Sequence, residues 1–213
     1  MTKLVTGATS PLVVVHPRLS LRSFVHRSGG GISSCYHAAG VSPDAAYWSS
    51  EFSSGPDIIY ALPFHVPDGG TLDRVGLVVG TCYGGSGLAR LGIYSSTDEE
   101  EVYPGSLLLD CGAVNMTSTG KQEITINQAV ARDALYYLCV NFDANSQYWS
   151  YCRTFQMYGG NTFGGKDPSY YSSLSGRGVL TVSSTYGAFP STFPASASAD
   201  VYYIPGLYYR LSA

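Results

Sequence analysis

Apolar residues are grouped in short runs along the middle of the chain, and turn residues separate these runs. Between Thr71 and Phe142 the runs are centred on residues 72–79, 88–94, 107–109, 124–126 and 135–142. Glycine, proline, serine and threonine lie between them, as in Gly84–Gly87 and Thr117–Gly120, and these residues favour turns. Short strands at regular spacing with turns between them predict an all-β fold, an antiparallel β-sandwich or barrel.

Further runs extend this pattern on both sides. Residues 57–66 are expected to form the first strand of the domain, and Pro63 within it predicts an edge or bulged strand because proline cannot donate a hydrogen bond to a neighbour. Other strands are expected at residues 147–158, 179–182 and 199–211. Residues 187–198 are expected to form a long loop, and such loops are uncommon in compact domains unless they are functional or flexible.

The first 45 residues differ from this pattern and indicate an extended N-terminal arm. They hold four of the twelve basic residues, and the glycine run at 29–31 provides a hinge. A short basic arm with a few apolar anchors is typical of a docking segment, although an extra β-hairpin of the same domain is the alternative. The candidate docking residues are Val14, Arg18, Arg22, Phe24 and Arg27.

The chain is therefore divided into three parts. A docking arm at 1–45 is followed by a connector at 46–56, which is aromatic and rich in serine. The remaining residues, 57–213, are expected to form the sandwich domain, which carries a long insertion rich in Gly, Ser and Tyr at about 159–178.

Charge and composition exclude several classes of function. The 213 residues include 12 Lys and Arg against 15 Asp and Glu, which gives a net charge of −3. No positive field is available to attract phosphate, so no nucleic-acid partner is expected. No apolar run approaches the roughly 20 residues that span a bilayer, so no membrane partner is expected. The N-terminus lacks the apolar core and cleavage site of a secretory signal, so release with a particle at lysis is the expected route for an extracellular role.

Neither the cysteines nor the histidines form a recognisable metal site. The five cysteines are an odd number without CxxC spacing, which argues against a disulfide framework and a four-thiolate zinc site. Most are expected to be buried small hydrophobes, and one bridge, from Cys139 to Cys152, requires that these residues lie on adjacent strands. The histidines lack HxH or HExxH spacing. We expect neither a metal nor a cofactor.

The chain also lacks a recognisable catalytic arrangement. Ser86 lies in Gly-Gly-Ser-Gly-Leu, which is not the G-x-S-x-G nucleophile elbow, and no helix is expected after it. Two carboxylates could act together in glycoside hydrolysis, but pairs of acids occur in any domain. The candidate acids are Asp73, Asp110, Glu123, Asp133 and Asp143. We therefore expect a protein that is not an enzyme.

The eighteen tyrosines favour a binding role. Tyrosine combines an apolar ring with a hydroxyl, which suits surfaces that contact sugars or other proteins. The candidate glycan-binding residues are Tyr148, Trp149, Tyr151, Tyr158, Tyr170 and Tyr171. Alternate residues of a strand share a face, so Trp149 and Tyr151 are expected to point the same way. Packing in the core or against identical subunits is the alternative role for these aromatic residues.

Four segments of the chain resemble a module of virion proteins from tailed bacteriophages. The segments are Leu91–Tyr94, Pro104–Asp110 with Gly112, Gly120–Ile126 and Leu135–Leu138. The module occurs in tail fibres, head fibres and related appendages, and it is similar in build to carbohydrate-binding modules. The resemblance covers about residues 57–142 and extends to the closing strand at 199–211. The chain departs from the module in its acidic loop at 98–101 and in the insertion after Tyr158.

The resemblance implies a jelly-roll sandwich and a structural role in a virion. It implies an appendage that is assembled in the host cytoplasm, released at lysis and displayed outward as a fibre, tail component or capsid decoration. Its expected partners are other virion proteins through the arm, identical subunits in a homo-oligomer such as a trimer, and a host-surface glycan. A free carbohydrate-binding module or lectin is the alternative, and a glycan-degrading enzyme is a less favoured one.

Overall fold

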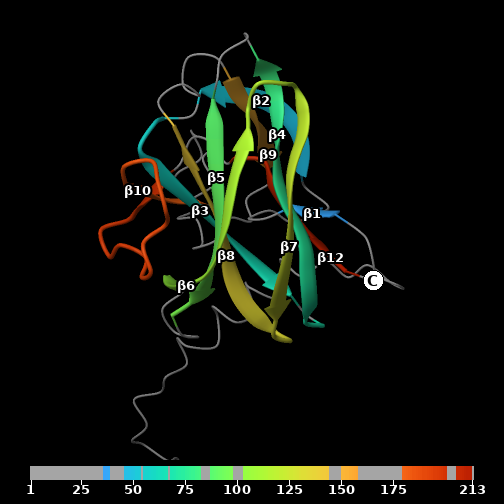
Figure 1. Ribbon diagram of the computed structural model, residues 1–213, viewed down its shortest axis with the longest axis vertical. Helices are drawn as coiled ribbons and strands as arrows, with labels where there is room; N and C mark the ends of the chain where they lie inside the picture. The colour runs from blue at the N-terminus through green and yellow to red at the C-terminus, as the bar shows by residue number, and fades with distance from the viewer. Residues whose placement is uncertain are drawn as a thin grey trace, which may run out of the picture.

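A computed structural model describes residues 36–38, 46–53, 55–66, 68–82, 87–97, 103–143, 150–157, 179–200 and 205–212. These residues contain strands and turns without a helix, and the strands form two stacked antiparallel sheets (Figure 1). Sheet A contains β1 (Tyr36–Ala38), β2 (Ala46–Ser53), β4 (Gly70–Cys82), β7 (Gly120–Val130), β9 (Ser150–Met157) and β12 (Leu207–Leu211). Sheet B contains β3 (Ile58–Val66), β5 (Leu88–Ser96), β6 (Pro104–Asn115), β8 (Ala134–Phe142), β10 (Val179–Ser183) and β11 (Ser198–Asp200).

Strand β4 is the centre of sheet A. Val79 pairs with Gly120 of β7 and also with Cys152 of β9, so β7 and β9 lie on opposite edges of β4. Strand β12 pairs with Leu72–Leu77, which also pair with β7, so β12 lies on the same edge as β9. Two strands therefore share one edge of β4 end to end, and β1 and β2 extend the sheet beyond them.

The strands from β3 to β8 pair in a nested order. Strand β3 pairs with β8 in sheet B, β4 pairs with β7 in sheet A, and β5 pairs with β6 in sheet B. This part of the chain is thus one long hairpin folded over so that successive pairs fall in alternate sheets. The predicted all-β, antiparallel β-sandwich is confirmed, and the jelly-roll assignment stays a prediction.

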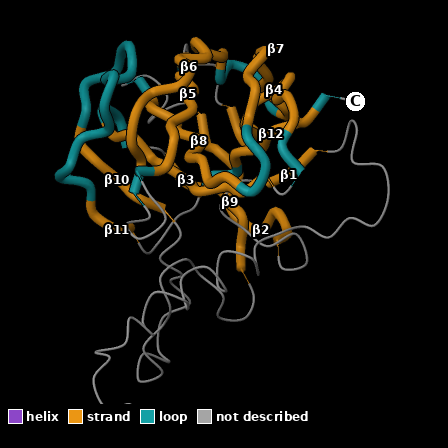
Figure 2. Tube along the Cα trace, turned by 90° about the horizontal axis from the view of Figure 1, so that it is seen from below, coloured by secondary structure: helices purple, strands orange, loops and turns teal. Residues whose placement is uncertain are grey.

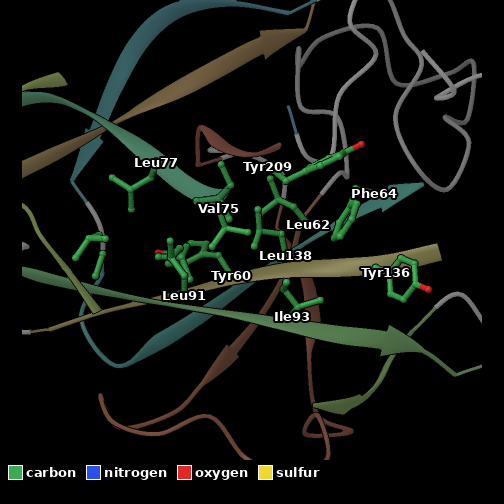
Figure 3. Packing of buried hydrophobic residues seen from close by; sticks show 14 of the residues in the cluster. Tyr60, Leu62, Phe64, Val75, Leu77, Leu91, Ile93, Tyr136, Leu138 and Tyr209 are labelled. Atoms are coloured by element: carbon green, nitrogen blue, oxygen red, sulfur yellow. The ribbon is translucent and has the colours of Figure 1, made fainter. Parts of the chain in front are cut away.

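The main core lies between the two sheets. Because side chains alternate along a strand, β3 directs Leu62 inward while its neighbours in sequence face outward. Leu62 and Leu138 of sheet B meet Val75 and Leu77 of sheet A, and all four are fully buried (Figure 3). Burial of each such side chain contributes about 1.5–3 kcal/mol, and the alternation fixes the register of the strands.

A second apolar cluster covers the outer face of sheet B. Its buried members are Ile59, Ala61, Tyr94, Tyr137, Cys139, Val182, Phe189 and Phe193. Strands β3 and β8 are apolar at nearly every position, so their outer side chains also need cover. The cover is the loop between β10 and β11, residues 184–197, which we call the strap. Figure 2 shows this loop in teal beside β10.

Aromatic packing holds the strap against strand β5. The Phe189 ring lies on Gly92, where an added Cβ would come within 2.7 Å of Phe189 Cδ2. Phe193 meets the Tyr94 ring edge-on, with 5.2 Å between ring centroids. A side chain larger than hydrogen at residue 92 would therefore displace Phe189, which explains why glycine fits at this position of β5.

Main-chain hydrogen bonds join the strap to the edge of sheet B. Leu107 N donates to Ser191 O at 2.9 Å, and Phe193 N donates to Gly105 O at 2.9 Å. These bonds pair part of the strap with the start of β6. Unpaired edges invite association with other chains, and the strap covers this part of the edge.

Pro63 lies in an interior strand of sheet B, so the prediction of an edge or bulged strand is wrong for β3. The pairing of β3 with β8 runs from Ile59 to Val66 without a register shift and includes Pro63. The pairing with β10 ends at Ala61. On that side none of the described strands pairs with Pro63, so its missing N–H removes no ladder hydrogen bond.

Cys139 and Cys152 lie on different sheets, so the disulfide considered between adjacent strands is excluded. Cys139 is on β8 in sheet B, fully buried beneath the strap and free, whereas Cys152 is on β9 in sheet A. Burial raises the pKa of the Cys139 thiol well above its usual value. This cysteine is a small buried hydrophobe, as expected from the sequence.

Part of the expected arm and connector belongs to sheet A. Strand β2, within residues 46–56, pairs with β9. Strand β1, within residues 1–45, pairs with β12. The rest of the arm and the insertion at 159–178 lie outside the described residues.

Replacement of two buried tyrosines under the strap by phenylalanine should have different effects on the free energy of unfolding. The Tyr94 hydroxyl donates to Pro190 O at 2.7 Å, whereas the Tyr137 hydroxyl has no hydrogen-bond partner among the described residues. Tyr94→Phe should lower the free energy of unfolding by about 1 kcal/mol. Tyr137→Phe should leave it unchanged or raise it, because it removes an unsatisfied polar group. Urea unfolding of both variants measures the free energy of unfolding. An equal loss of this free energy in the two variants would contradict the prediction.

Candidate functional site

Of the six aromatic residues expected to bind a glycan, the structure describes the backbone position of one. Tyr151 lies in β9, where it pairs with Thr81 of β4 and Ser53 of β2. The residues outside the described part of the chain are Tyr148, Trp149, Tyr158, Tyr170, Tyr171 and the docking residues Val14, Arg18, Arg22, Phe24 and Arg27. Their roles stay predictions.

One described tyrosine lies on the outer face of sheet A with polar partners. The Tyr208 ring lies over Gly76, where an added Cβ would be 2.6 Å from the Tyr208 hydroxyl oxygen. The hydroxyl donates to Glu123 Oε1 at 3.2 Å, and Lys121 Nζ lies 5.6 Å from the ring centroid, in reach of a cation–π interaction. Tyr208 is only 4% exposed, so its ring is not an open platform for a sugar.

An ion pair joins β12 to β4 on the same sheet. Arg210 Nε and Nη2 donate to the two carboxylate oxygens of Asp73 at 2.8 and 2.6 Å, which is the two-bond geometry that strengthens such pairs. The pair lies at register shifts in both ladders, between Leu72 and Arg74 and between Arg210 and Leu211. The hydrogen bond from Arg210 is the main reason that the pKa of Asp73 is lowered.

A second group of polar side chains lies on the outer face of sheet B, where the strap begins. We call it the strap cluster; its members are Arg90, Asp110, Asn141, Asp143 and Tyr186. Arg90 of β5 pairs with Asn141 of β8, and residues paired across strands present their side chains on the same face. Strands β5, β6 and β8 supply Arg90, Asp110 and Asn141, Asp143 directly follows β8, and the strap supplies Tyr186.

Asp110 connects this cluster to the strap. Arg90 Nε donates to both carboxylate oxygens of Asp110, at 2.9 and 3.0 Å. The backbone nitrogens of Gly112 and Phe189 also donate to this carboxylate, each at 3.2 Å. One carboxylate therefore accepts from β5, from its own strand and from the strap, which fixes the position of all three.

Asn141 holds the beginning of the strap and keeps one atom unsatisfied. Its Nδ2 donates to the backbone oxygens of Ser184 and Thr185 at 3.2 and 3.4 Å. Its Oδ1 is buried and has no hydrogen-bond donor among the described residues. Asn141 is 2% exposed, and buried acceptors of this kind are uncommon unless a water or a ligand satisfies them.

Tyr186 brings an aromatic ring to the cluster. Its backbone nitrogen donates to Asp57 Oδ1 at 2.7 Å, and its side chain is half-buried. Burial raises the pKa of Tyr186, the Asp143 and Asp110 carboxylates raise it further, and Arg90 opposes them. The hydroxyl therefore lies within the electrostatic reach of all three charged members.

The strap cluster combines an aromatic ring with hydrogen-bond donors and acceptors, which is the combination that sequence analysis sought at residues 148–171. Sequence reasoning missed it because its members come from four separate segments. Asp110 and Phe189, which it joins, are 79 residues apart in sequence. The only local signal was the long loop itself, because long loops in compact domains tend to carry function.

The carboxylates considered for glycoside hydrolysis are divided between the sheets. Asp73 and Glu123 lie on sheet A with Arg210 and Tyr208 as partners, whereas Asp110 lies on sheet B. Within the described ranges, no three His, Cys, Asp or Glu side chains are grouped so that they could hold a metal ion. No helix among the described residues has the length and apolar character needed to cross a membrane.

Comparison with protein-family models gives no match, and comparison with curated proteins gives none either. The function is therefore inferred from the residues, the fold, the polar side chains on sheet A and the strap cluster on sheet B.

The Asp73–Arg210 pair predicts a pH-dependent loss of stability in Asp73→Asn. Because the folded chain holds the pKa of Asp73 below its ordinary value of 3.8, the pair stabilises the fold above that pH. This contribution is lost as pH falls through the lower folded pKa. Unfolding measured from about pH 7 to about pH 2 should show the variant less stable at neutral pH, with the gap closing in acid.

Asp133→Asn is the matched control for this experiment. The Asp133 side chain is 67% exposed, its nearest charged partners lie 3.9 Å away, and its positive φ of 56° suits asparagine equally well. The control should match the wild type at every pH. A gap for Asp73→Asn that stays constant into acid would contradict the assigned role of the ion pair.

Proposed function

We propose that this protein is a structural component of a bacteriophage virion, displayed outward as a fibre, tail component or capsid decoration. One observation carries the proposal: the four segments that resemble the phage appendage module lie in four consecutive strands. They fall within β5, β6, β7 and β8, respectively. A chance likeness between turn-rich sequences would not be expected to follow the strand order of one folded unit.

The nested pairing supports the jelly-roll form of this module. In such a fold one long antiparallel hairpin is rolled so that its successive pairs fall in alternate sheets. The pairs β3–β8, β4–β7 and β5–β6 follow this order.

The surface of the sandwich suits display on a particle. Charged residues make up 13% of the chain, about half the usual share, and the strap covers part of the β6 edge with its own main chain. Among the described strands β7 pairs only with β4, so its other edge can accept a neighbouring subunit. This supports the proposed homo-oligomer, for which a trimer is the expected form, with the N-terminal arm at residues 1–45 docking to other virion proteins.

A host-surface glycan is the proposed outward ligand. The alternative, a free carbohydrate-binding module or lectin, is favoured by the same strap cluster, since a sandwich face with an aromatic ring among hydrogen-bonding groups suits sugars on any protein. The two functions differ in the role of the N-terminal arm, because only a virion protein needs the arm to dock to a particle.

Deletion of residues 1–31 tests the virion role. This deletion removes the candidate docking residues and the glycine run but keeps β1, which is paired with β12. The truncated chain should be absent from purified phage particles, measured by immunoblot after assembly from the genome that encodes it. Its urea midpoint should equal that of the full chain, because no described strand is removed.

The combined variant Arg18→Ala, Arg22→Ala, Arg27→Ala should reduce incorporation in the same assay, since the basic side chains are the proposed contacts. Absence of the full-length chain from particles would refute the virion role. Normal incorporation of the truncated chain would instead refute docking through the arm.

A further inference from the structure

We propose that the strap cluster is a binding site for an uncharged saccharide, with the Tyr186 ring as its platform. The inference rests on the proposed function in taking a glycan as the ligand, and it places the site away from residues 148–171.

The Tyr186 ring is more exposed than the buried tyrosines of the described chain; Tyr103 is also half-buried, but its hydroxyl is bonded to Pro194 O. Tyr94 and Tyr137 are fully buried beneath the strap, and Tyr208 is 4% exposed. Tyr186 is only half-buried and emerges beside the two carbonyls that Asn141 holds. An aromatic face of this kind can pack against the C–H face of a sugar ring, which is apolar.

Arg90, whose charge acts on the Tyr186 hydroxyl, has hydrogen-bonding capacity that the described part of the fold does not use. Arg90 uses Nε to bind Asp110, and its two terminal amino groups make no hydrogen bond within the described residues; its side chain is 28% exposed. Asn141 Oδ1 also lacks a donor, but the described chain encloses it. A sugar hydroxyl can accept from the terminal amino groups of Arg90 while the ring packs on Tyr186.

The charges of this region select among sugars. The Tyr186 backbone nitrogen donates to Asp57, and Asp110 and Asp143 act electrostatically on the Tyr186 hydroxyl, against the single guanidinium of Arg90, which already binds Asp110. A uronic acid or another acidic sugar would add a further negative charge to this group, at an electrostatic cost. An uncharged hexose carries no such penalty and still meets the available donors and acceptors.

The site is held in place before a ligand arrives. Arg90, Asp110 and Asn141 lie on paired strands, and Asp110 and Asn141 also fix the strap through its backbone. Binding therefore orders few additional groups, which favours affinity.

Binding of the full-length chain to dextran, mannan, galactan and alginate tests this inference. Isothermal titration should show saturable binding to at least one of the three uncharged polysaccharides and none to alginate. Tyr186→Ala should weaken that binding at least about tenfold, and Tyr186→Phe, which keeps the ring, by less than about threefold. Arg132→Ala, in the turn between β7 and β8 where the side chain is 74% exposed, is the control, and it should bind as the wild type does.

Each variant is first compared with the wild type by urea unfolding, so that loss of the fold is not mistaken for loss of the site. Unchanged binding by a folded Tyr186→Ala variant would overturn the inference, as would stronger binding to alginate than to the uncharged polymers. No binding to any of the four polysaccharides would overturn it too. The particle-incorporation assay needs no glycan, so the virion role stands or falls separately.

Discussion

The two-sided burial of strands β3 and β8 is the constraint on which the rest of the structure depends. Their inner side chains pack against sheet A, and Ile59, Ala61, Tyr137 and Cys139 on their outer side are also buried. An uncovered outer face would expose a contiguous apolar patch, which in a soluble chain promotes association. The strap solves this problem with Phe189 and Phe193, which fill the face over strand β5.

A loop that crosses an apolar face carries backbone polar groups that must be satisfied. This requirement explains the polar side chains on an otherwise apolar sheet. Asn141 and Asp57 bind the backbone at the start of the strap, Asp110 binds Phe189 N further along, and the hydroxyls of Tyr94 and Tyr103 bind carbonyls of Pro190 and Pro194. The strap cluster is thus first a means of fastening the strap, and its unused donors and acceptors are a consequence of that geometry.

Local patterns were sufficient to predict the strands but not the way in which the strap packs. The apolar runs between Thr71 and Phe142 correspond to β4 through β8, because each run is bounded by turn residues and sandwich strands are short. The loop at 187–198 was also expected. Its packing depends on partners such as Tyr94, 96 residues from Pro190, and no local pattern encodes contacts at that distance in the chain.

Local sequence patterns were also insufficient to place single residues correctly. The two sides of β3 have different neighbours along its length, so Pro63 could not be placed correctly from its own properties. Cys139 and Cys152 are close in sequence but lie on strands of opposite sheets, because the chain changes sheets between β8 and β9. The strap cluster required both kinds of information, since it joins three strands to a distant loop.

Along the shared edge of β4, the two strands β12 and β9 differ in how much of β4 they pair with. Strand β12 is paired along Leu72–Leu77, in the middle of the sandwich, whereas β9 meets β4 only between Val79 and Cys82. Strands β2 and β9 pair mainly with each other and so form a unit attached at one end of the sheet. Opening such a unit costs less free energy than unfolding the sandwich. The sequence around it is therefore free to diverge in length and chemistry while the pairing of β3 to β8 keeps the fold unchanged.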